Sequence, residues 1–150
     1  MVARKSLKGD YCPSARSLDV IGDWWSLLIV RDAFDGLTRF GEFQKSLGIA
    51  KNILTERLKT LVASGILELA PTSEGGARME YRLTAMGKDL FPVMVALRQF
   101  GERHLFEPAE DHSLLVDRAS GQSVHLDIRT QDGRLIGPDE TVIVRVPDEK

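Results

Sequence analysis

Polar residues in the segment 51–64 recur at the spacing of one helix face, with side chains that could bind nucleic acid. These residues are Lys51, Asn52, Thr55, Glu56 and Lys59, with Arg57 at the flank. Amide, hydroxyl, carboxylate and ammonium groups can hydrogen-bond to base edges in the DNA major groove or bind phosphates. Arg57 is placed to bind a phosphate or to form an internal salt bridge. The alternative for the whole face is the solvated side of an ordinary helix.

Cys12 is the one cysteine of the chain and its one candidate for thiol chemistry. It precedes Pro13, a residue favoured at the first position of a helix, and a thiol at a helix N-terminus can gain thiolate character. Lys8 and Arg16 lie nearby in the sequence and would help. The thiol is predicted to be either a redox sensor or a packed, inert side chain. A single cysteine cannot form an intramolecular disulfide, which favours a reducing, cytoplasmic setting.

The polar face needs a buried face behind it, and the same segment supplies one. Leu54, Leu58 and Leu61 recur at helical spacing, and Gly65 follows, where a glycine can end a helix at positive φ. A shorter amphipathic helix is predicted from about Arg39 to Leu47. Only three residues, 48–50, separate the two helices, so the pair is predicted to be a helix-turn-helix.

A β-hairpin is predicted directly after this pair. Residues 66–69 and 79–83 have strand character, and the polar, glycine-containing stretch 71–78 connects them. Two more helices are predicted upstream, one from Pro13 to about Gly22 and one over Trp24–Phe34. A helix-turn-helix followed by a hairpin is the order of a winged helix, whose hairpin, here 71–82, would lie at the adjacent backbone or minor groove.

The rest of the chain is predicted to be one long helix followed by a small antiparallel β appendage. Thr84 is a candidate N-cap for a helix over 85–106, bent at Pro92, whose apolar residues favour dimerisation. Strands are predicted at 113–118, 123–130 and 141–146, with turns at 119–122 and 131–134. The predicted organisation is therefore α+β: a winged helix-turn-helix domain with dimerisation helices over 1–106, and the appendage over 107–150.

Composition excludes several classes of protein. The chain is 43% hydrophobic and 28% charged, and it has no apolar run long enough for a membrane helix. The net charge is −2, but residues 1–100 hold 14 Lys/Arg and 11 Asp/Glu, whereas residues 101–150 hold 6 and 11. The predicted DNA-binding part is thus mildly basic, at +3. The three histidines lack metal-ligand spacing, and no catalytic motif is present, so we expect no enzyme activity, metal or cofactor.

The order of these segments resembles the HxlR-type family of bacterial transcription regulators, winged-helix proteins related to the MarR group. The resemblance covers Tyr11 to Gly101 and rests on five segments in order. They are Cys12-Pro13 with Leu18-Asp19-Val20-Ile21-Gly22, Trp25-Ser26-Leu27-Leu28-Ile29-Val30-Arg31, Arg39-Phe40-Gly41-Glu42-Phe43, Leu54-Thr55-Glu56-Arg57-Leu58, and Arg78-Met79-Glu80-Tyr81-Arg82-Leu83-Thr84.

The resemblance implies a homodimer that binds double-stranded DNA at an inverted-repeat operator, as a repressor under a small-molecule or redox effector. It places Arg78 in the wing, against a minor groove or phosphate unless it pairs with Glu74 or Glu80, and Arg39 near the backbone. It also implies oxidant sensing at Cys12. Some relatives carry paired cysteines in a C-terminal hairpin, where this chain has residues such as Ser120, Thr130 and Asp132, so the appendage is predicted to be metal-free. The alternative is a winged-helix module that binds protein instead of DNA.

Overall fold

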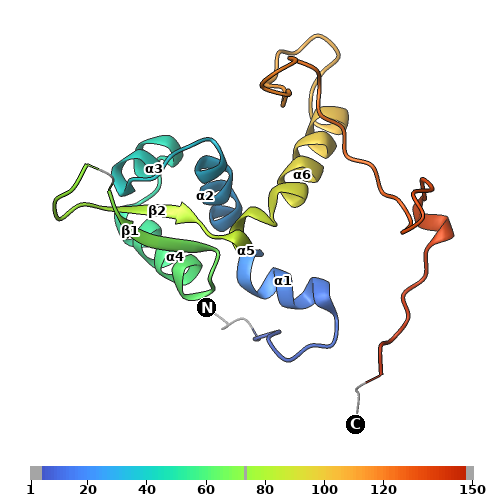
Figure 1. Cartoon of the computed structure of the whole chain (residues 1–150), viewed down its shortest axis with the longest axis horizontal. Helices are drawn as coiled ribbons and strands as arrows, with labels where there is room; N and C mark the ends of the chain where they lie inside the picture. The colour runs from blue at the N-terminus through green and yellow to red at the C-terminus, as the bar shows by residue number, and fades with distance from the viewer. Residues whose placement is uncertain (1–4, 73, 148–150) are drawn as a thin grey trace. The chain divides into compact units, whose positions relative to one another are not determined.

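The computed structural model describes residues 5–72 and 74–147 (Figure 1). The elements are, in chain order, α1 (Pro13–Ile21), α2 (Trp24–Phe34), α3 (Phe40–Leu47), α4 (Lys51–Ala63), β1 (Leu67–Pro71), β2 (Met79–Leu83), α5 (Ala85–Lys88), α6 (Phe91–His104) and the short 3-10 helix η1 (Pro138–Glu140). The four helices and the hairpin predicted before residue 84 are confirmed, with bounds that differ by at most a few residues. No helix in the described ranges is long and apolar enough to cross a membrane.

The chain forms two compact units, Met1–Leu97 and Arg98–Lys150, with the division inside α6. Each unit is described by itself below. The sequence-based boundary at 106/107 separates the predicted DNA-binding part from the appendage. It stays a prediction.

The residues at their N-termini determine where the first two helices begin. Pro13 opens α1 after Cys12, which stands at the N-cap without a side-chain capping bond. Asp23 caps α2, because its carboxylate accepts a hydrogen bond from the backbone N–H of Ser26 at 3.0 Å. Gly22, between the two helices, must lack a side chain, since a Cβ there would lie 2.2 Å from the carbonyl oxygen of Leu18. The C-cap of α1, Gly22, and the N-cap of α2, Asp23, are thus consecutive residues.

The helix-turn-helix is built as the periodicity predicted. Gly48 ends α3 in the left-handed conformation at φ 60°, and its N–H donates to the carbonyl of Gln44. Ala50 stands at the N-cap of α4 and makes no side-chain cap. At the other end of α4, Gly65 has φ 81°, as predicted. One core lies behind α4 and contains Ile21, Ile29, Val30, Phe43, Ile49, Leu54, Leu58, Leu61, Ile66 and Leu67.

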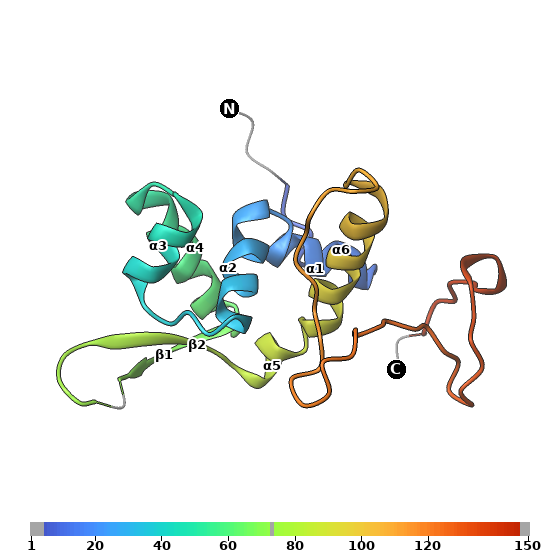
Figure 2. The same cartoon turned by 90° about the horizontal axis from the view of Figure 1, so that it is seen from above.

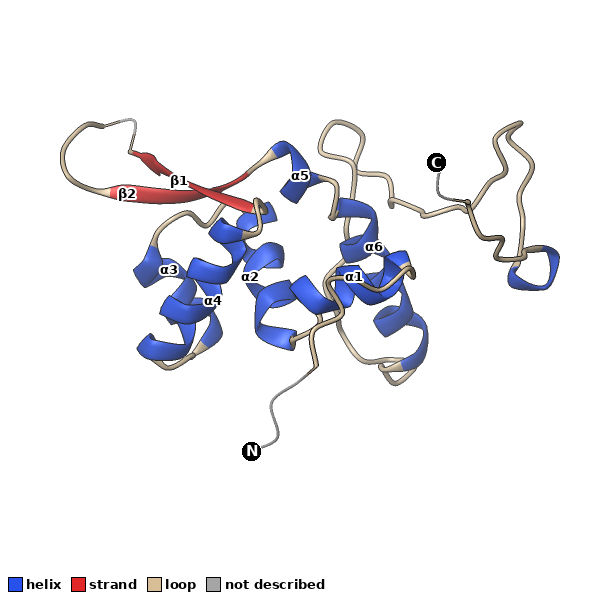
Figure 3. Cartoon of the chain, turned by 90° about the horizontal axis from the view of Figure 1, so that it is seen from below, coloured by secondary structure: helices blue, strands red, loops and turns tan. Residues whose placement is uncertain are grey.

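The hairpin β1–β2 is a two-stranded antiparallel sheet in which Leu67 pairs with Leu83 and Pro71 with Met79. Tyr81 in β2 also donates its backbone N–H to the carbonyl of Thr38 at 2.7 Å, which ties the α2–α3 loop to the sheet. In Figures 2 and 3 the loop between the strands extends beyond α3 and α4. The hairpin is therefore a wing beside the helix-turn-helix.

The single helix expected over 85–106 is wrong, because the structure has two helices there. Thr84 does cap the first, as predicted, by accepting from the N–H of Gly87. That helix ends at Lys88, and α6 begins at Phe91. Pro92 accounts for the break: it lacks an N–H and disfavours helical geometry in the residue before it, so it lies in the first turn of a new helix instead of bending an old one.

Arg98–Lys150 contains the predicted turns but not the predicted strands. The turns are present, with Gly121 and Gly133 at positive φ, and they bring together only two isolated antiparallel bridges, Val116–Ser123 and Arg129–Leu135. Residues 141–147 form no strand with the described residues. Most of the apolar side chains in these segments are exposed in the single chain, among them Leu126, Ile128, Val142, Val144 and Val146. Alternation alone cannot form a sheet without a layer to cover it.

Hydrogen bonds from side chains hold this second unit's turns and its part of α6. Arg98 donates to the backbone carbonyl and the hydroxyl of Ser113, both at 2.9 Å, and Gln99 donates to the carbonyl of Val124 at 2.9 Å. In the first turn, the hydroxyl of Ser120 donates to Asp117 and lowers the pKa of that carboxyl below its ordinary value. Polar contacts thus replace the missing apolar core. Within the described ranges no group of three His, Cys, Asp or Glu side chains could hold a metal ion.

Candidate DNA-binding surface

The helix α4 has one fully buried face and one exposed face. Leu54, Leu58 and Leu61 are at most 1% exposed and anchor the helix on α2 and β1. On the other side Lys51, Asn52, Thr55, Glu56 and Lys59 are all exposed. The structure therefore brings together on one surface five of the eight residues predicted to bind DNA.

Most of these five side chains keep their full hydrogen-bonding capacity. Within the described parts of the chain, no polar partner is present for the side chains of Asn52, Glu56 and Lys59. The hydroxyl of Thr55 instead donates to the carbonyl of Lys51 at 2.8 Å. Since that proton is used, Thr55 offers a lone pair or its methyl group to a ligand.

Arg57 lies away from this group and is held from inside. Its Nε lies 3.1 Å from Oδ2 of Asp23, the N-cap of α2. This Nε is buried, and its N–H is not aligned for a hydrogen bond, so charge attraction dominates the contact. Of the two roles predicted for Arg57, the structure shows the internal salt bridge.

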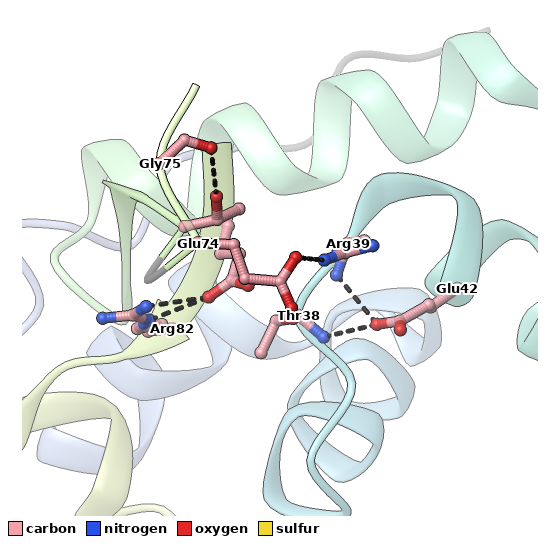
Figure 4. A network of polar contacts seen from close by, with 8 residues as sticks. Thr38, Arg39, Glu42, Glu74, Gly75 and Arg82 are labelled. Carbon is pink, nitrogen blue, oxygen red and sulfur yellow. Dashed lines mark hydrogen bonds and ion pairs between the residues drawn. The ribbon is translucent and has the colours of Figure 1, made fainter. Parts of the chain in front are cut away.

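Arg39 begins α3 and faces the wing, as Figure 4 shows. Its Nη2 lies 4.0 Å from Oε2 of Glu74 in the wing loop, and both side chains are exposed. Oε2 of Glu42 accepts the backbone N–H groups of Thr38 and Arg39 at 2.9 and 3.0 Å, closing the first turn of α3. These two N–H donors, Thr38 first, lower the pKa of Glu42 below its ordinary value, with the Arg39 charge adding a smaller effect.

Arg78 is exposed at the foot of the wing loop. The intramolecular partners considered for it are taken by other cations: Glu74 pairs with Arg39, and Glu80 pairs with Arg82 at 2.8 Å. No ion pair joins Arg78 to any described residue. A phosphate could therefore bind this guanidinium without first displacing a carboxylate.

Cys12 is half-buried, and its backbone N–H donates to Asp10 at 2.8 Å. Arg16, one of the two cations expected to support the thiol, donates its Nε to the backbone carbonyl of Asp10. Redox sensing by Cys12 stays a prediction.

Two acidic residues of this surface were missed by the sequence analysis. Asp23 had a local signal, since a Gly-Asp pair before an apolar run marks a helix start. Its second contact, with Arg57, depends on how α2 packs on α4, and a single sequence does not encode that visibly. Glu74 was considered only as a partner for Arg78, and its position beside Arg39 likewise depends on the fold of the wing.

The helices α2, α3 and α4 pack together, and α3 and α4 form a helix-turn-helix with an exposed polar face beside a two-stranded wing. This is the architecture of a winged helix-turn-helix protein. The profile of the HxlR-like helix-turn-helix family matches residues 20–109. This chain belongs to that family of transcription regulators, which are not enzymes.

Relatives with this domain are named as transcription regulators. An uncharacterized HTH-type transcriptional regulator of Mycobacterium bovis is 44% identical over 93 residues, which are 62% of this chain and 59% of that protein. Another from Synechocystis is 34% identical over 72% of this chain and 81% of its own length. The alignment thus spans less than two thirds of the mycobacterial relative.

Solved structures extend the likeness beyond the shared domain. PA1607, a proposed transcription factor, is 55% identical and superposes with a TM-score of 0.89 over 93% of this chain and 99% of its own. The reduced form of the redox regulator HypR is 32% identical, with a TM-score of 0.58 over 63% of this chain and 94% of that one. The match to PA1607 is too long to be confined to Met1–Leu97, so it includes much of the second unit.

Proposed function

We propose that this chain represses transcription as a homodimer, with α4 in the major groove of an inverted-repeat operator and the wing at the adjacent backbone or minor groove. The observation that carries the proposal is the exposed face of α4 on a helix whose other face is fixed in the core. A two-fold dimer would place two such helices about 34 Å apart, in successive major grooves. Acting on DNA, the protein would work in the cytoplasm, as its single cysteine favours.

The proposed contacts divide into two kinds. Lys51, Lys59, Arg78 and Arg39 supply positive charge for phosphates, while Asn52, Thr55 and Glu56 supply hydrogen-bonding groups for base edges. Arg39 carries a counterion, because Glu74 lies 4.0 Å away. A phosphate must displace that carboxylate, so Arg39 should contribute less than Arg78 to the affinity for DNA.

The experiment begins by selecting bound DNA from a random pool with the full chain. Fluorescence anisotropy with the selected duplex then compares variants across a salt series. Lys59→Ala and Arg78→Ala should weaken binding to every sequence, and each should reduce the slope of log K against log salt by about 0.9. Asn52→Ala and Thr55→Ala should change the preferred sequence, at about 1–3 kcal/mol for a lost base contact.

Arg118→Ala is the matched control, because Arg118 is an exposed arginine of the acidic second unit. It should leave affinity and salt slope unchanged. If all four substitutions on α4 and the wing change affinity less than about threefold, as for a residue outside the interface, this face does not bind DNA. A chain that selects no sequence but captures a protein would support the alternative, a winged-helix module for protein binding.

The proposal that the protein is a dimer rests on exposed apolar side chains of α6. Leu97 and Phe100 are about half exposed, at 49% and 55%, unusually so for large apolar groups one turn apart on a helix. Phe100→Asp should produce monomers in light scattering, because a dimer would bury the new charge unpaired. Arg103→Asp is the control on the same helix. A stable dimer of Phe100→Asp that still binds DNA would remove Phe100 from the interface.

A further inference from the structure

We propose that Arg57 acts in DNA binding as a positioning residue, through a fixed link to Asp23, and not by contacting a phosphate. The inference rests on the proposed DNA-binding function. It assigns to Asp23, outside the helix-turn-helix, the task of holding the recognition helix α4 in place.

The carboxylate of Asp23 contacts two helices, α2 through Ser26 and α4 through Arg57. Its Oδ1 accepts the hydroxyl of Ser26 at 2.6 Å, while Oδ2 accepts the backbone N–H of Ser26 at 3.0 Å and lies 3.1 Å from Nε of Arg57. Ser26 is itself buried, at 1% exposure, so these bonds hold the carboxylate from the protein interior. The hydrogen bonds from Ser26 therefore orient both carboxylate oxygens of Asp23, independently of Arg57.

Arg57 sits between the two faces of α4. Its neighbour Glu56 is exposed on the polar face, and its other neighbour Leu58 is buried in the core. The buried leucines fix α4 on the core by packing, and the ion pair to the capped start of α2 adds a polar contact that further restricts its rotation and axial shift. Recognition of base edges requires that precision, because hydrogen bonds weaken steeply with misalignment.

The same contact reduces what Arg57 can offer a phosphate. The Nε edge of its guanidinium is next to a negative charge, and its side chain is only 38% exposed. Lys59 on the same helix is exposed and has no partner within the described ranges, so it is far better placed for a phosphate. The pair itself is partly exposed, so its contribution to overall stability is modest. Its main effect is on geometry.

The test measures operator binding of four full-length proteins by anisotropy across a salt series: wild type, Arg57→Gln, Asp23→Asn and the double variant. Asparagine caps helices as well as aspartate does, so Asp23→Asn keeps a cap on α2 while it removes the charge and one of the two acceptor oxygens. Lys59→Gln is the matched control for a phosphate contact.

If the link positions α4, Arg57→Gln and Asp23→Asn each weaken operator binding about three- to tenfold, and the double variant binds no worse than the weaker single variant. The salt slope stays that of the wild type in all three, whereas Lys59→Gln reduces it by about 0.9. A phosphate role for Arg57 predicts the opposite. Asp23→Asn would then leave binding unchanged or tighten it, and Arg57→Gln would lower the slope. Either result overturns the proposal.

Thermal unfolding of the same four proteins separates this inference from the proposed function. A real link makes the two substitutions non-additive, so the double variant melts no lower than the less stable single variant. Additive losses in melting temperature overturn the link whatever the DNA result. If the wild type selects no DNA sequence, the proposed function fails, and the melting data still decide whether Asp23 and Arg57 are coupled.

Discussion

The units Met1–Leu97 and Arg98–Lys150 both contain branched apolar residues in regular patterns, yet only the first buries them. Ile29 in α2 is fully buried, whereas Ile143 in the segment 141–147 is 96% exposed. The difference lies in what surrounds each residue. Ile29 belongs to the buried cluster on α2, a helix that contacts α1, α3, α4 and β2, while Ile143 follows η1 in an extended stretch shown at the red end of Figure 1. An apolar pattern specifies a fold only where a second layer can cover it.

The largest expected effect comes from truncating these two isoleucines. Ile29→Ala should lower the free energy of unfolding by about 2–5 kcal/mol, because it leaves a cavity in a closed core. Ile143→Ala, the matched substitution, should change it by less than about 0.5 kcal/mol in the isolated chain. Urea unfolding followed by circular dichroism measures both. Equal losses would show that residue 143 is buried and that the contrast between the units is false.

Two glycines sharpen the same contrast. A Cβ at Gly87 in α5 would lie 2.2 Å from the carbonyl oxygen of Ile66, while a Cβ at Gly101 in α6 would meet nothing within 4 Å. Gly87→Ala should therefore cost about 1–3 kcal/mol, since α5 must shift away from the start of β1. Gly101→Ala should be neutral or stabilise by up to about 1 kcal/mol, because alanine favours a helix. The melting temperature should fall for Gly87→Ala and stay unchanged or rise for Gly101→Ala, and a Gly87→Ala protein as stable as the wild type would argue against this close approach.

The smallest expected effect is on pH dependence. Two backbone N–H groups lower the pKa of Glu42 at the start of α3, so its folded pKa lies below its unfolded pKa. The stability that this carboxylate contributes is present above the ordinary glutamate range and is lost as the pH falls through the lowered folded pKa. Glu42→Gln should accordingly be less stable than wild type near neutral pH, and the gap should close in acid.

Asp117 provides the comparison for this measurement, because its pKa is also lowered, by Ser120, but in the unit without a core. Asp117→Asn should leave the pH dependence of unfolding unchanged when α-helix signal is followed. A gap between wild type and Glu42→Gln that persists unchanged into acid would exclude the carboxylate as its cause.

The sequence predicted the first unit well because its signals are local and agree with one another. Gly48 and Gly65 mark helix ends by their positive φ, and Leu54, Leu58 and Leu61 mark a buried stripe. The exposed face of α4 followed from that stripe. What the sequence did not reveal depends on which elements meet: Asp23 with Arg57, and Arg39 with Glu74.

The errors after residue 84 have a common physical origin. The apolar residues of α6 looked continuous with α5, although Pro92 favours a new helix start. In the second unit, alternating residues suggested three strands, but a strand needs a paired neighbour as well as a pattern. Turns at Gly121 and Gly133 were predictable because they depend on one residue's conformational freedom.

The most direct measurement of the central account is an NMR titration of the isotope-labelled full chain with its selected duplex. Amide shifts should move most in α4 and the wing, at residues such as Asn52, Lys59 and Arg78, while turn residues such as Gly121 and Gly133 should stay in place. Movement of the 98–147 signals with α4 unchanged would contradict the assignment of DNA binding to the helix-turn-helix.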